Sequence, residues 1–187
     1  EDDKTRLYFA ADALQLKSVV NTIWKDEGIR YVFSTRSKVP FILNEAGDKL
    51  YDGDYQFVPG QDEIIREGSA GYVVSYGELL YRALDAVERA REAGIDVGLI
   101  NKPTLNVVDE AMIKTVGNAP FALVVEGQNE KTGLGSRYGS WMLQRGLSTK
   151  YDVMAVAKLG AGGTATHIPY QGIAPDDILA RIKAMAG

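Results

Sequence analysis

A chain of 187 residues, 45% of them hydrophobic, is long enough to bury the core of one domain and a small additional segment. Its net charge of −4 argues against nucleic acid or an anionic membrane as the main partner, because both favour dense basic surfaces. With no cysteine and one histidine, it has no disulfides, no thiolate metal sites and no paired-histidine metal sites. No apolar run reaches the roughly 20 residues of a membrane-spanning helix, and we expect a cytoplasmic protein.

The first forty or so residues predict a strand, a helix and a second strand. Residues 7–10 form a short apolar run, and Asp12 is suited to cap the helix that follows. One face of that helix carries apolar residues at helical spacing: Leu16, Val19, Val20 and Ile23. Residues 31–33 are β-branched and aromatic, which is typical of a strand. One βαβ unit cannot cover both faces of a sheet, and Glu1 is not an initiator methionine, so we expect a fragment of a longer protein.

Between residues 44 and 68 the hydrophobic periodicity is lost. Glycines and a proline, with acidic residues among them, indicate turns and an extended connector. Tyr51, Tyr55 and Phe57 are expected to fasten this connector to a neighbouring surface. We therefore predict three parts: residues 1–43, a linker at 44–68, and a domain at 69–187.

The remaining residues alternate between strand and helix patterns. The segment at 121–125 is the most hydrophobic, as expected for a central strand of a parallel sheet. The other strands are predicted at 72–76, 97–100 and 153–157, and helices at 77–93, 108–116, 136–144 and from Asp176 onward. This order predicts a three-layer α/β fold, a mostly parallel sheet of about five strands with helices on both faces.

A Gly-rich loop, Gly133 to Ser136, lies between the central strand and a helix. Free backbone amides at such a helix start can bind phosphate. The spacing matches neither G-x-G-x-x-G nor G-x-x-x-x-G-K-[ST], however. We favour the simpler interpretation, in which the glycines let the strand and helix pack closely and Ser136 caps the helix.

Three other features are judged non-catalytic. Gly160 to Thr164 is expected to be a flexible loop. His167, close behind it, is more often a surface or capping residue than a pocket residue, and no G-x-S-x-G elbow accompanies it. Asp52-Gly53-Asp54 inverts the Gly-Asp-Gly order that binds metal and diphosphate in thiamine-diphosphate enzymes, so we interpret it as a turn.

The segment Ser34-Thr35-Arg36-Ser37-Lys38 directly follows a predicted strand. In α/β folds, hydroxyls and cations at the carboxyl end of a strand can collect an anionic ligand. The planar guanidinium of arginine suits phosphate especially well. A solvated turn explains the same residues, and the sequence pattern leaves both interpretations open.

Several segments together resemble the transketolase family. Residues 31–40 are similar to the end of the family's pyrimidine-binding domain, where a strand finishes in Ser/Thr-Arg-x-x-[Leu/Val]-Pro. Residues 9–13 resemble the Pro-Ala-Asp-Ala stretch before that domain's last helix, and 68–76 resemble the entry to the C-terminal domain. Residues 124–126 with 133–136 resemble a Val-Glu … Gly-Gly-Leu-Gly signature. The resemblance assigns 1–43 to the end of the pyrimidine-binding domain and 69–187 to the C-terminal domain.

What the resemblance implies for this chain is limited. Arg36 matches the arginine that binds the phosphate of the sugar substrate. The activating glutamate and the ligands of thiamine diphosphate and magnesium belong to parts of the family that precede this chain. The resemblance therefore implies no catalytic, cofactor-binding or metal-binding residue here, inactivity of the isolated chain, and a role in domain packing within a homodimer. Thr132, where the family usually has glycine, leaves the subfamily open.

Other functions remain open at this stage. The same domain occurs in the beta subunit of 2-oxo acid dehydrogenases and in deoxyxylulose-phosphate synthase, although Arg36 favours an enzyme acting on phosphorylated sugars over the dehydrogenase. A non-catalytic interaction or dimerisation domain is a further alternative. The last is a small anion- or nucleotide-binding module that uses the Gly133 loop.

Overall fold

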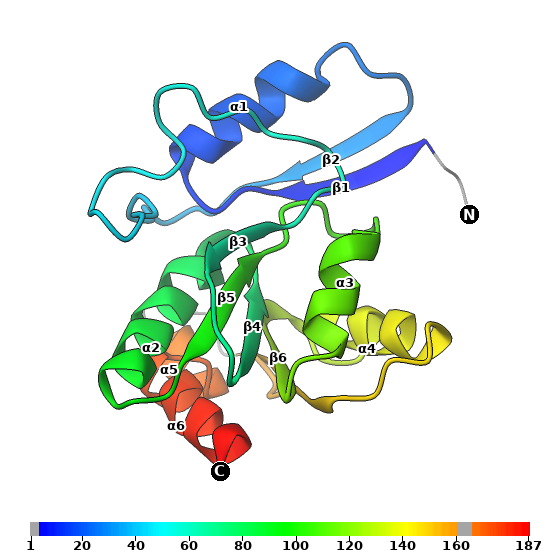
Figure 1. The fold of residues 1–187 in the computed structure, drawn as a ribbon. Helices are drawn as coiled ribbons and strands as arrows, with labels where there is room; N and C mark the ends of the chain where they lie inside the picture. Colours follow the sequence, from blue (N-terminus) through cyan, green and yellow to red (C-terminus); the bar gives the residue numbers. More distant parts are fainter. Residues whose placement is uncertain (1–3, 161–165) are drawn as a thin grey trace.

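The computed structural model describes residues 4–160 and 166–187, which form two packed parts (Figure 1). The smaller, N-terminal part contains β1 (Thr5–Phe9), α1 (Ala13–Ile23) and β2 (Ile29–Phe33). Its two strands are parallel neighbours, with Leu7 opposite Tyr31 in the register. The predicted strand–helix–strand unit is therefore confirmed.

Asp12 begins α1 as the sequence predicts. Its Oδ1 atom accepts hydrogen bonds of 2.9 Å from the backbone N–H groups of Leu14 and Gln15, which satisfies two free donors of the first turn. Of the predicted apolar face, Val19 is fully buried, whereas Val20 is 46% exposed. Adjacent positions point about 100° apart on a helix, so both cannot face one core.

The larger part is built on a five-stranded sheet in the order β3-β5-β4-β6-β7. Its strands are β3 (Glu63–Arg66), β4 (Gly71–Ser75), β5 (Val97–Asn101), β6 (Phe121–Asn129) and β7 (Lys150–Val156). All neighbours are parallel except β3, which runs antiparallel to β5 at one edge. This confirms the predicted fold class, a mostly parallel sheet of about five strands.

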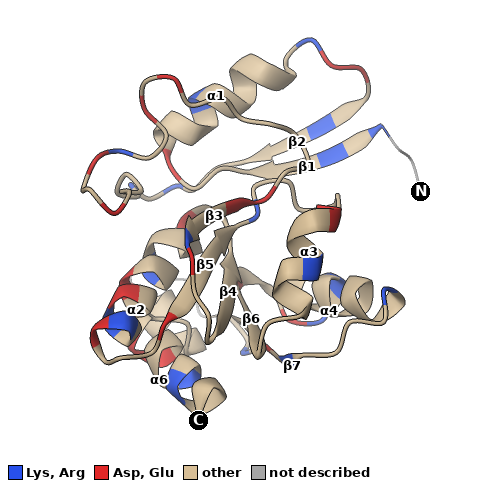
Figure 2. Ribbon diagram, viewed as in Figure 1, with Lys and Arg blue, Asp and Glu red and all other residues tan. Residues whose placement is uncertain are grey.

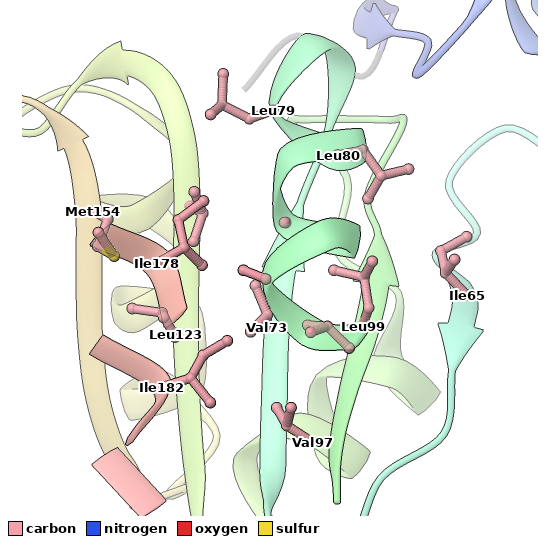
Figure 3. Packing of buried hydrophobic residues seen from close by; sticks show 14 of the residues in the cluster. Ile65, Val73, Leu79, Leu80, Val97, Leu99, Leu123, Met154, Ile178 and Ile182 are labelled. Atoms are coloured by element: carbon pink, nitrogen blue, oxygen red, sulfur yellow. The ribbon is translucent and has the colours of Figure 1, made fainter. Parts of the chain in front are cut away.

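Helices cover both faces of this sheet. The 3-10 turn η1 (Gly77–Leu79) leads into α2 (Leu80–Glu92), and α5 (His167–Gln171) and α6 (Pro175–Ala186) lie on the same side. Figure 3 shows their core, where Leu80, Ile178 and Ile182 meet the strand residues Val73 and Leu123. The opposite face packs against α3 (Glu110–Gly117) and α4 (Leu134–Gln144). Acidic and basic residues intermingle along α2, while the inner strands carry few charges (Figure 2).

Two elements were not predicted. Strand β3 lies within the stretch that the sequence indicated as a connector without regular structure. It is a four-residue edge strand with charged ends, and its partner β5 is about 35 positions away, so its pairing is a tertiary effect. The short helix α5 was also missed, because five residues are too few to display a helical period.

The two parts share backbone hydrogen bonds. Beyond β2, strand β1 pairs in the antiparallel sense with the segment after β5, through a bridge between Tyr8 and Thr104. The N–H of Phe9 donates to the Pro103 carbonyl at 2.9 Å, and the N–H of Leu105 donates to the Leu7 carbonyl at 2.8 Å. The small sheet is thus anchored to the large domain by main-chain bonds that do not depend on side-chain identity.

Candidate functional site

A groove of about 540 Å³ lies at the junction of the two parts, and we call it the junction groove. One wall consists of residues 34–37, which follow β2, together with the rings of Phe9 and Phe33. The other wall comes from η1 and α2, the outer end of β6, and α5. Its size falls within the range of about 300–1,000 Å³ that is usual for small-molecule sites.

Arg36, the residue singled out from the sequence, lines this groove. Its side chain is exposed and makes no hydrogen bond or ion pair with any residue in the described part of the chain. The local turn is held instead by Thr35, whose hydroxyl donates to the Ser37 carbonyl at 2.8 Å. The guanidinium therefore keeps all its donors available to a ligand.

The opposite wall carries an ion pair between Glu78 and Arg82, as their four-residue spacing on a helix predicts. Arg82 Nη1 donates to the Glu78 carbonyl at 2.8 Å and lies 3.8 Å from the Glu78 carboxylate. Its guanidinium also stacks on Tyr81, 4.4 Å from the ring centre. Because Glu78 offsets the charge of Arg82, Arg36 is the groove's uncompensated permanent cation among the described residues.

His167 also lines the junction groove, from the first residue of α5. The sequence favoured an ordinary surface or capping histidine, and the structure places it half-buried in the same groove as Arg36. Nothing local in the sequence connects the two, because about 130 residues separate them. Of the preceding Gly160 to Thr164 stretch, residues 161–164 lie outside the described residues.

The Gly133 loop is closed by an internal carboxylate. Glu126, fully buried on β6, accepts hydrogen bonds of 2.7 Å from the backbone N–H groups of Leu134 and Gly135 and from the Tyr76 hydroxyl. Two amides at the start of α4 that could have held a phosphate thus already bind an anion of the protein. This finding argues against the Gly133 loop as a nucleotide or phosphate site.

The glycines of this loop permit close packing, as the favoured interpretation had it. A Cβ on Gly133 would lie 2.4 Å from the Glu126 carboxylate oxygens, and one on Gly135 would lie 2.4 Å from Val153 Cγ1. The expected cap at Ser136 is wrong: Gly133 occupies the N-cap position, and the Ser136 hydroxyl donates to the Glu130 carbonyl at 2.9 Å. Glu126, from the preceding strand, satisfies the donors that a serine cap would have served.

A buried polar cluster joins the smaller part to the edge of the large sheet. Glu63 Oε2 accepts hydrogen bonds from Gln15 Nε2 at 2.8 Å, from the Tyr51 hydroxyl at 3.0 Å and from Asn101 Nδ2 at 2.9 Å. Tyr55 donates to the other oxygen. Burial raises the pKa of Glu63, and these donors oppose that rise because they favour the charged carboxylate. The sequence predicted that the tyrosines fasten the connector, but not Gln15 or Glu63.

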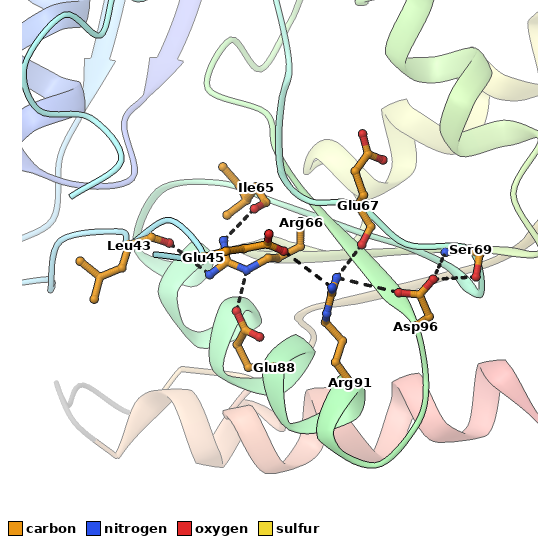
Figure 4. A network of polar contacts seen from close by, with 9 residues as sticks. All are labelled: Leu43, Glu45, Ile65, Arg66, Glu67, Ser69, Glu88, Arg91 and Asp96. Atoms are coloured by element: carbon orange, nitrogen blue, oxygen red, sulfur yellow. Dashed lines mark hydrogen bonds and ion pairs between the residues drawn. The ribbon is translucent and has the colours of Figure 1, made fainter. Parts of the chain in front are cut away.

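A second joint lies beside this cluster, around Arg66 (Figure 4). Arg66 is 6% exposed, and its guanidinium donates to Glu88 at 2.6 Å and to the carbonyls of Ile65 and Leu43. Leu43 lies just before the connector and Glu88 lies on α2, so the Arg66 side chain links the end of the N-terminal segment to the sheet edge and a helix. The polar cluster around Glu63 and the contacts of Arg66 together hold the two walls of the junction groove in a fixed position relative to each other.

A buried ion pair supports the far side of β5. Lys102 is fully buried, and its ammonium donates to Asp62 Oδ1 and to the Val107 carbonyl, both at 2.8 Å. Burial raises the pKa of Asp62 to about 6, although the charge of Lys102 opposes the rise. This pair lies apart from the groove-lining residues, so we assign it a structural role.

A sequence model described as "Transketolase, C-terminal domain" matches residues 60–178. The chain belongs to the transketolase family. Over 177 residues it is 31% identical to the transketolase family protein y4mN of Sinorhizobium fredii, covering 92% of the chain and 49% of that protein. It is 28% identical to one of the subunits of an apulose-4-phosphate transketolase from Actinobacillus succinogenes, covering 70% of the chain and 43% of that relative. This transketolase-family chain thus spans about half the length of these relatives.

The fold of the family is also seen in a solved structure. A split-gene transketolase, described as an inactive beta4 tetramer, matches 98% of this chain and 58% of its own with a TM-score of 0.87. The sequences are 20% identical, so this comparison supports the fold alone. Both the small β1–α1–β2 part and the five-stranded domain are included in the match.

For the magnesium ion that the resemblance implies for the family, the described residues of this chain offer no cluster of ligands. No group of three or more His, Asp or Glu side chains that could hold a metal ion occurs among them. Asp52 Oδ1 accepts a 2.9 Å hydrogen bond from the Gly53 amide within a turn, as the sequence predicted.

In the part of the chain that the structure describes, no helix is long and apolar enough to cross a membrane.

Proposed function

We propose that this chain is the C-terminal portion of a thiamine-diphosphate-dependent enzyme that transfers two-carbon ketol units between sugar phosphates. In that enzyme Arg36 binds the phosphate of the substrate, and parts outside this chain hold the cofactor and magnesium. The isolated chain is inactive, and it packs against those parts within a cytoplasmic homodimer. The proposal rests on one observation above all: in a transketolase-family chain, Arg36 lines a groove and has no partner among the residues that the structure describes.

The chemistry of the junction groove supports a phosphorylated sugar. A guanidinium binds phosphate through parallel N–H donors, which makes it more selective for this group than a point charge. Ser34 and Gln128 offer further polar groups along the same groove, suited to sugar hydroxyls. Phe9 and Phe33, with ring centres 5.9 Å apart, supply an apolar floor.

Packing supports a place within a larger assembly. On β2, Ile29 is 54% exposed, Tyr31 52% and Phe33 39%, which is unusual for alternate residues of one strand face. Among the described strands, β2 pairs with β1 alone. The first relatives are about twice as long as this chain, so further protein is available in them to cover such a strand.

A second candidate is deoxyxylulose-phosphate synthase. The enzyme of that name from Rhodopirellula baltica is 33% identical over 101 residues, although the match covers 54% of this chain and 15% of that protein. Its product, named as a phosphorylated sugar, requires the same kind of anion contact. Arg36 therefore keeps its proposed role under either activity, and the two differ in the acceptor and donor compounds.

The role of Arg36 is tested in the complete enzyme that contains this chain. Arg36→Gln should raise KM for a phosphorylated sugar substrate about tenfold or more, because a charge-assisted hydrogen bond contributes about 1.5–3 kcal/mol. The same variant should leave KM for an unphosphorylated ketose within about twofold, since no phosphate contact is lost. Steady-state kinetics with both substrates measure the ratio.

Lys38→Gln is the matched control. Lys38 lies two residues further along the same exposed segment, and it does not line the junction groove. Its loss removes the same charge, so it reports the effect of net charge alone. Equal losses with both substrates in Arg36→Gln, or an equal effect of Lys38→Gln, would contradict the proposed phosphate contact.

A further inference from the structure

His167 is the ionisable residue of the junction groove to which the proposed function gives no role. It lies half-buried on the wall of the larger domain, across the junction from the part that carries Arg36. Its ring makes no hydrogen bond or ion pair with residues 4–160 or 166–187. A half-buried imidazole with free nitrogens beside a groove is available to a ligand.

The helix that carries His167 is held firmly in place. Ile168 is 8% exposed and packs into the core beneath α2 and α6. Gln171 Oε1 accepts hydrogen bonds from the backbone N–H groups of Ala157 at 3.2 Å and Lys158 at 2.9 Å, and its Nε2 donates to the Lys158 carbonyl. The position of His167 is therefore fixed by both ends of α5, as a preorganised contact requires.

The charges around His167 favour an anion. From the surrounding elements, the groove receives Arg36, Arg82 and Glu78, and the last two lie 3.8 Å apart as a pair. On the outer side of α5, Lys158 lies 5.2 Å from the Tyr170 ring centre. Residues 161–165 bring no ionisable side chain. With Arg82 offset by Glu78, the remaining permanent charge among the described residues that line this groove is that of Arg36.

We propose that His167 is a second anion-binding residue of the junction groove, which contacts from the larger domain the same phosphate-type anion that Arg36 contacts from the smaller part. This inference rests on the proposed function and extends it: the bound anion bridges the two parts. Neutral imidazole can donate one hydrogen bond to such an anion, and the protonated ring adds a positive charge. Binding is therefore stronger when the ring carries its second proton.

Sulfate is the suitable probe, because its charge stays constant over the pH range in which histidine titrates. The full chain is titrated with sodium sulfate at constant ionic strength, followed by NMR. We expect at least about fivefold tighter binding at about pH 5.5 than at about pH 8, since one positive charge at about 4 Å in water contributes about 1 kcal/mol for each negative charge of the anion. By linkage, saturation with sulfate should favour the protonated form of the His167 ring by the same factor.

The single histidine of the chain makes the assignment direct. His167→Asn should bind sulfate as weakly as the wild type does at about pH 8, with no change at about pH 5.5. Asp62 also titrates near this range, but it is retained in that variant, so its contribution would persist. Tyr170→Phe, on the same helix but outside the groove, is the matched control and should behave as the wild type. Circular dichroism confirms that each variant is folded.

The outcomes separate the two proposals. If sulfate binds the wild type and is lost in Arg36→Gln, but the pH dependence persists in His167→Asn or is absent from the wild type, His167 has no contact with the anion and Arg36 keeps its role. If Arg36→Gln binds sulfate as the wild type does, the proposed function of Arg36 fails. No sulfate binding by the wild type at about pH 5.5 would overturn both.

Discussion

Lys102→Met is expected to lower the free energy of unfolding by about 3–5 kcal/mol near neutral pH, the usual cost of removing one partner of a buried ion pair. Asp62 is buried and has Lys102 as its cationic partner at 2.8 Å. Without that ammonium, folding must either bury an unpaired carboxylate or bind a proton to it. Urea unfolding followed by circular dichroism measures the change.

Two further variants make this test specific. Lys102→Met combined with Asp62→Asn should be less destabilised than Lys102→Met alone, because a neutral amide of similar shape requires no counter-charge. Asp176→Asn breaks an exposed pair with Arg89, 2.7 Å long, and should cost less than about 1 kcal/mol. A double variant as unstable as the single one would show that packing, rather than charge, holds this site.

The same carboxyl predicts a pH dependence. Its folded-state pKa is raised to about 6 from an ordinary value of 3.8, so the folded protein holds this proton more tightly than the unfolded chain. The corresponding stability is fully present below about pH 4 and is lost as the pH rises through about 6. Unfolding measured across this interval should show the loss in the wild type and not in Asp62→Asn.

Glu126→Ala should cost about 3 kcal/mol or more, because it leaves buried donors without an acceptor. Each hydrogen bond to a charged group contributes about 1.5–3 kcal/mol, and three donors lie at 2.7 Å from this carboxylate. Amide exchange at Leu134 and Gly135 should accelerate most, since their bonds fix the first turn of α4. Hydrogen exchange and urea unfolding measure the two effects.

Two milder substitutions separate the contribution of the Tyr76 hydroxyl to the free energy of unfolding from that of the two backbone amides. Tyr76→Phe removes one donor and leaves the amides bound, so we expect a loss of about 1 kcal/mol. Glu126→Gln keeps the shape but offers one acceptor in place of two, and should fall between the other variants. If Glu126→Ala were no worse than Tyr76→Phe, the start of α4 would not depend on this carboxylate.

Local patterns were enough to predict much of the large domain. The apolar run at β6 and the cap at Asp12 each express a local preference that the tertiary structure also uses. Strand β3 was not predicted from its local pattern, because the charged residues at both of its ends suggested a connector. Lys102 is the extreme case: nothing in its neighbourhood indicates that a lysine after β5 is fully buried, since the compensating carboxylate is 40 positions away.

The candidate site was predictable only in part. The hydroxyls and the cation after β2 indicated Arg36, because ligands in α/β folds bind at the carboxyl ends of strands. The sequence also contains His167, the ion pair of Glu78 with Arg82, and Gln128, but on four elements whose convergence depends on the crossovers of the sheet. At the Gly133 loop the favoured packing interpretation holds, but the sequence did not indicate that Glu126 binds the amides at the start of α4.

The main-chain pairing of β1 with the segment after β5 has a consequence for exchanging segments between family members. The two partners, Leu7 and Leu105, lie on either side of the connector, so a chimera with its crossover at residues 44–68 unites a strand and an edge from different parents. The backbone bonds tolerate that exchange, but Gln15 and Glu63 would each need a compatible counterpart. Crossover points in this family should therefore be chosen so that both partners of each buried polar contact come from the same parent. A break in the regular structure is not a sufficient guide.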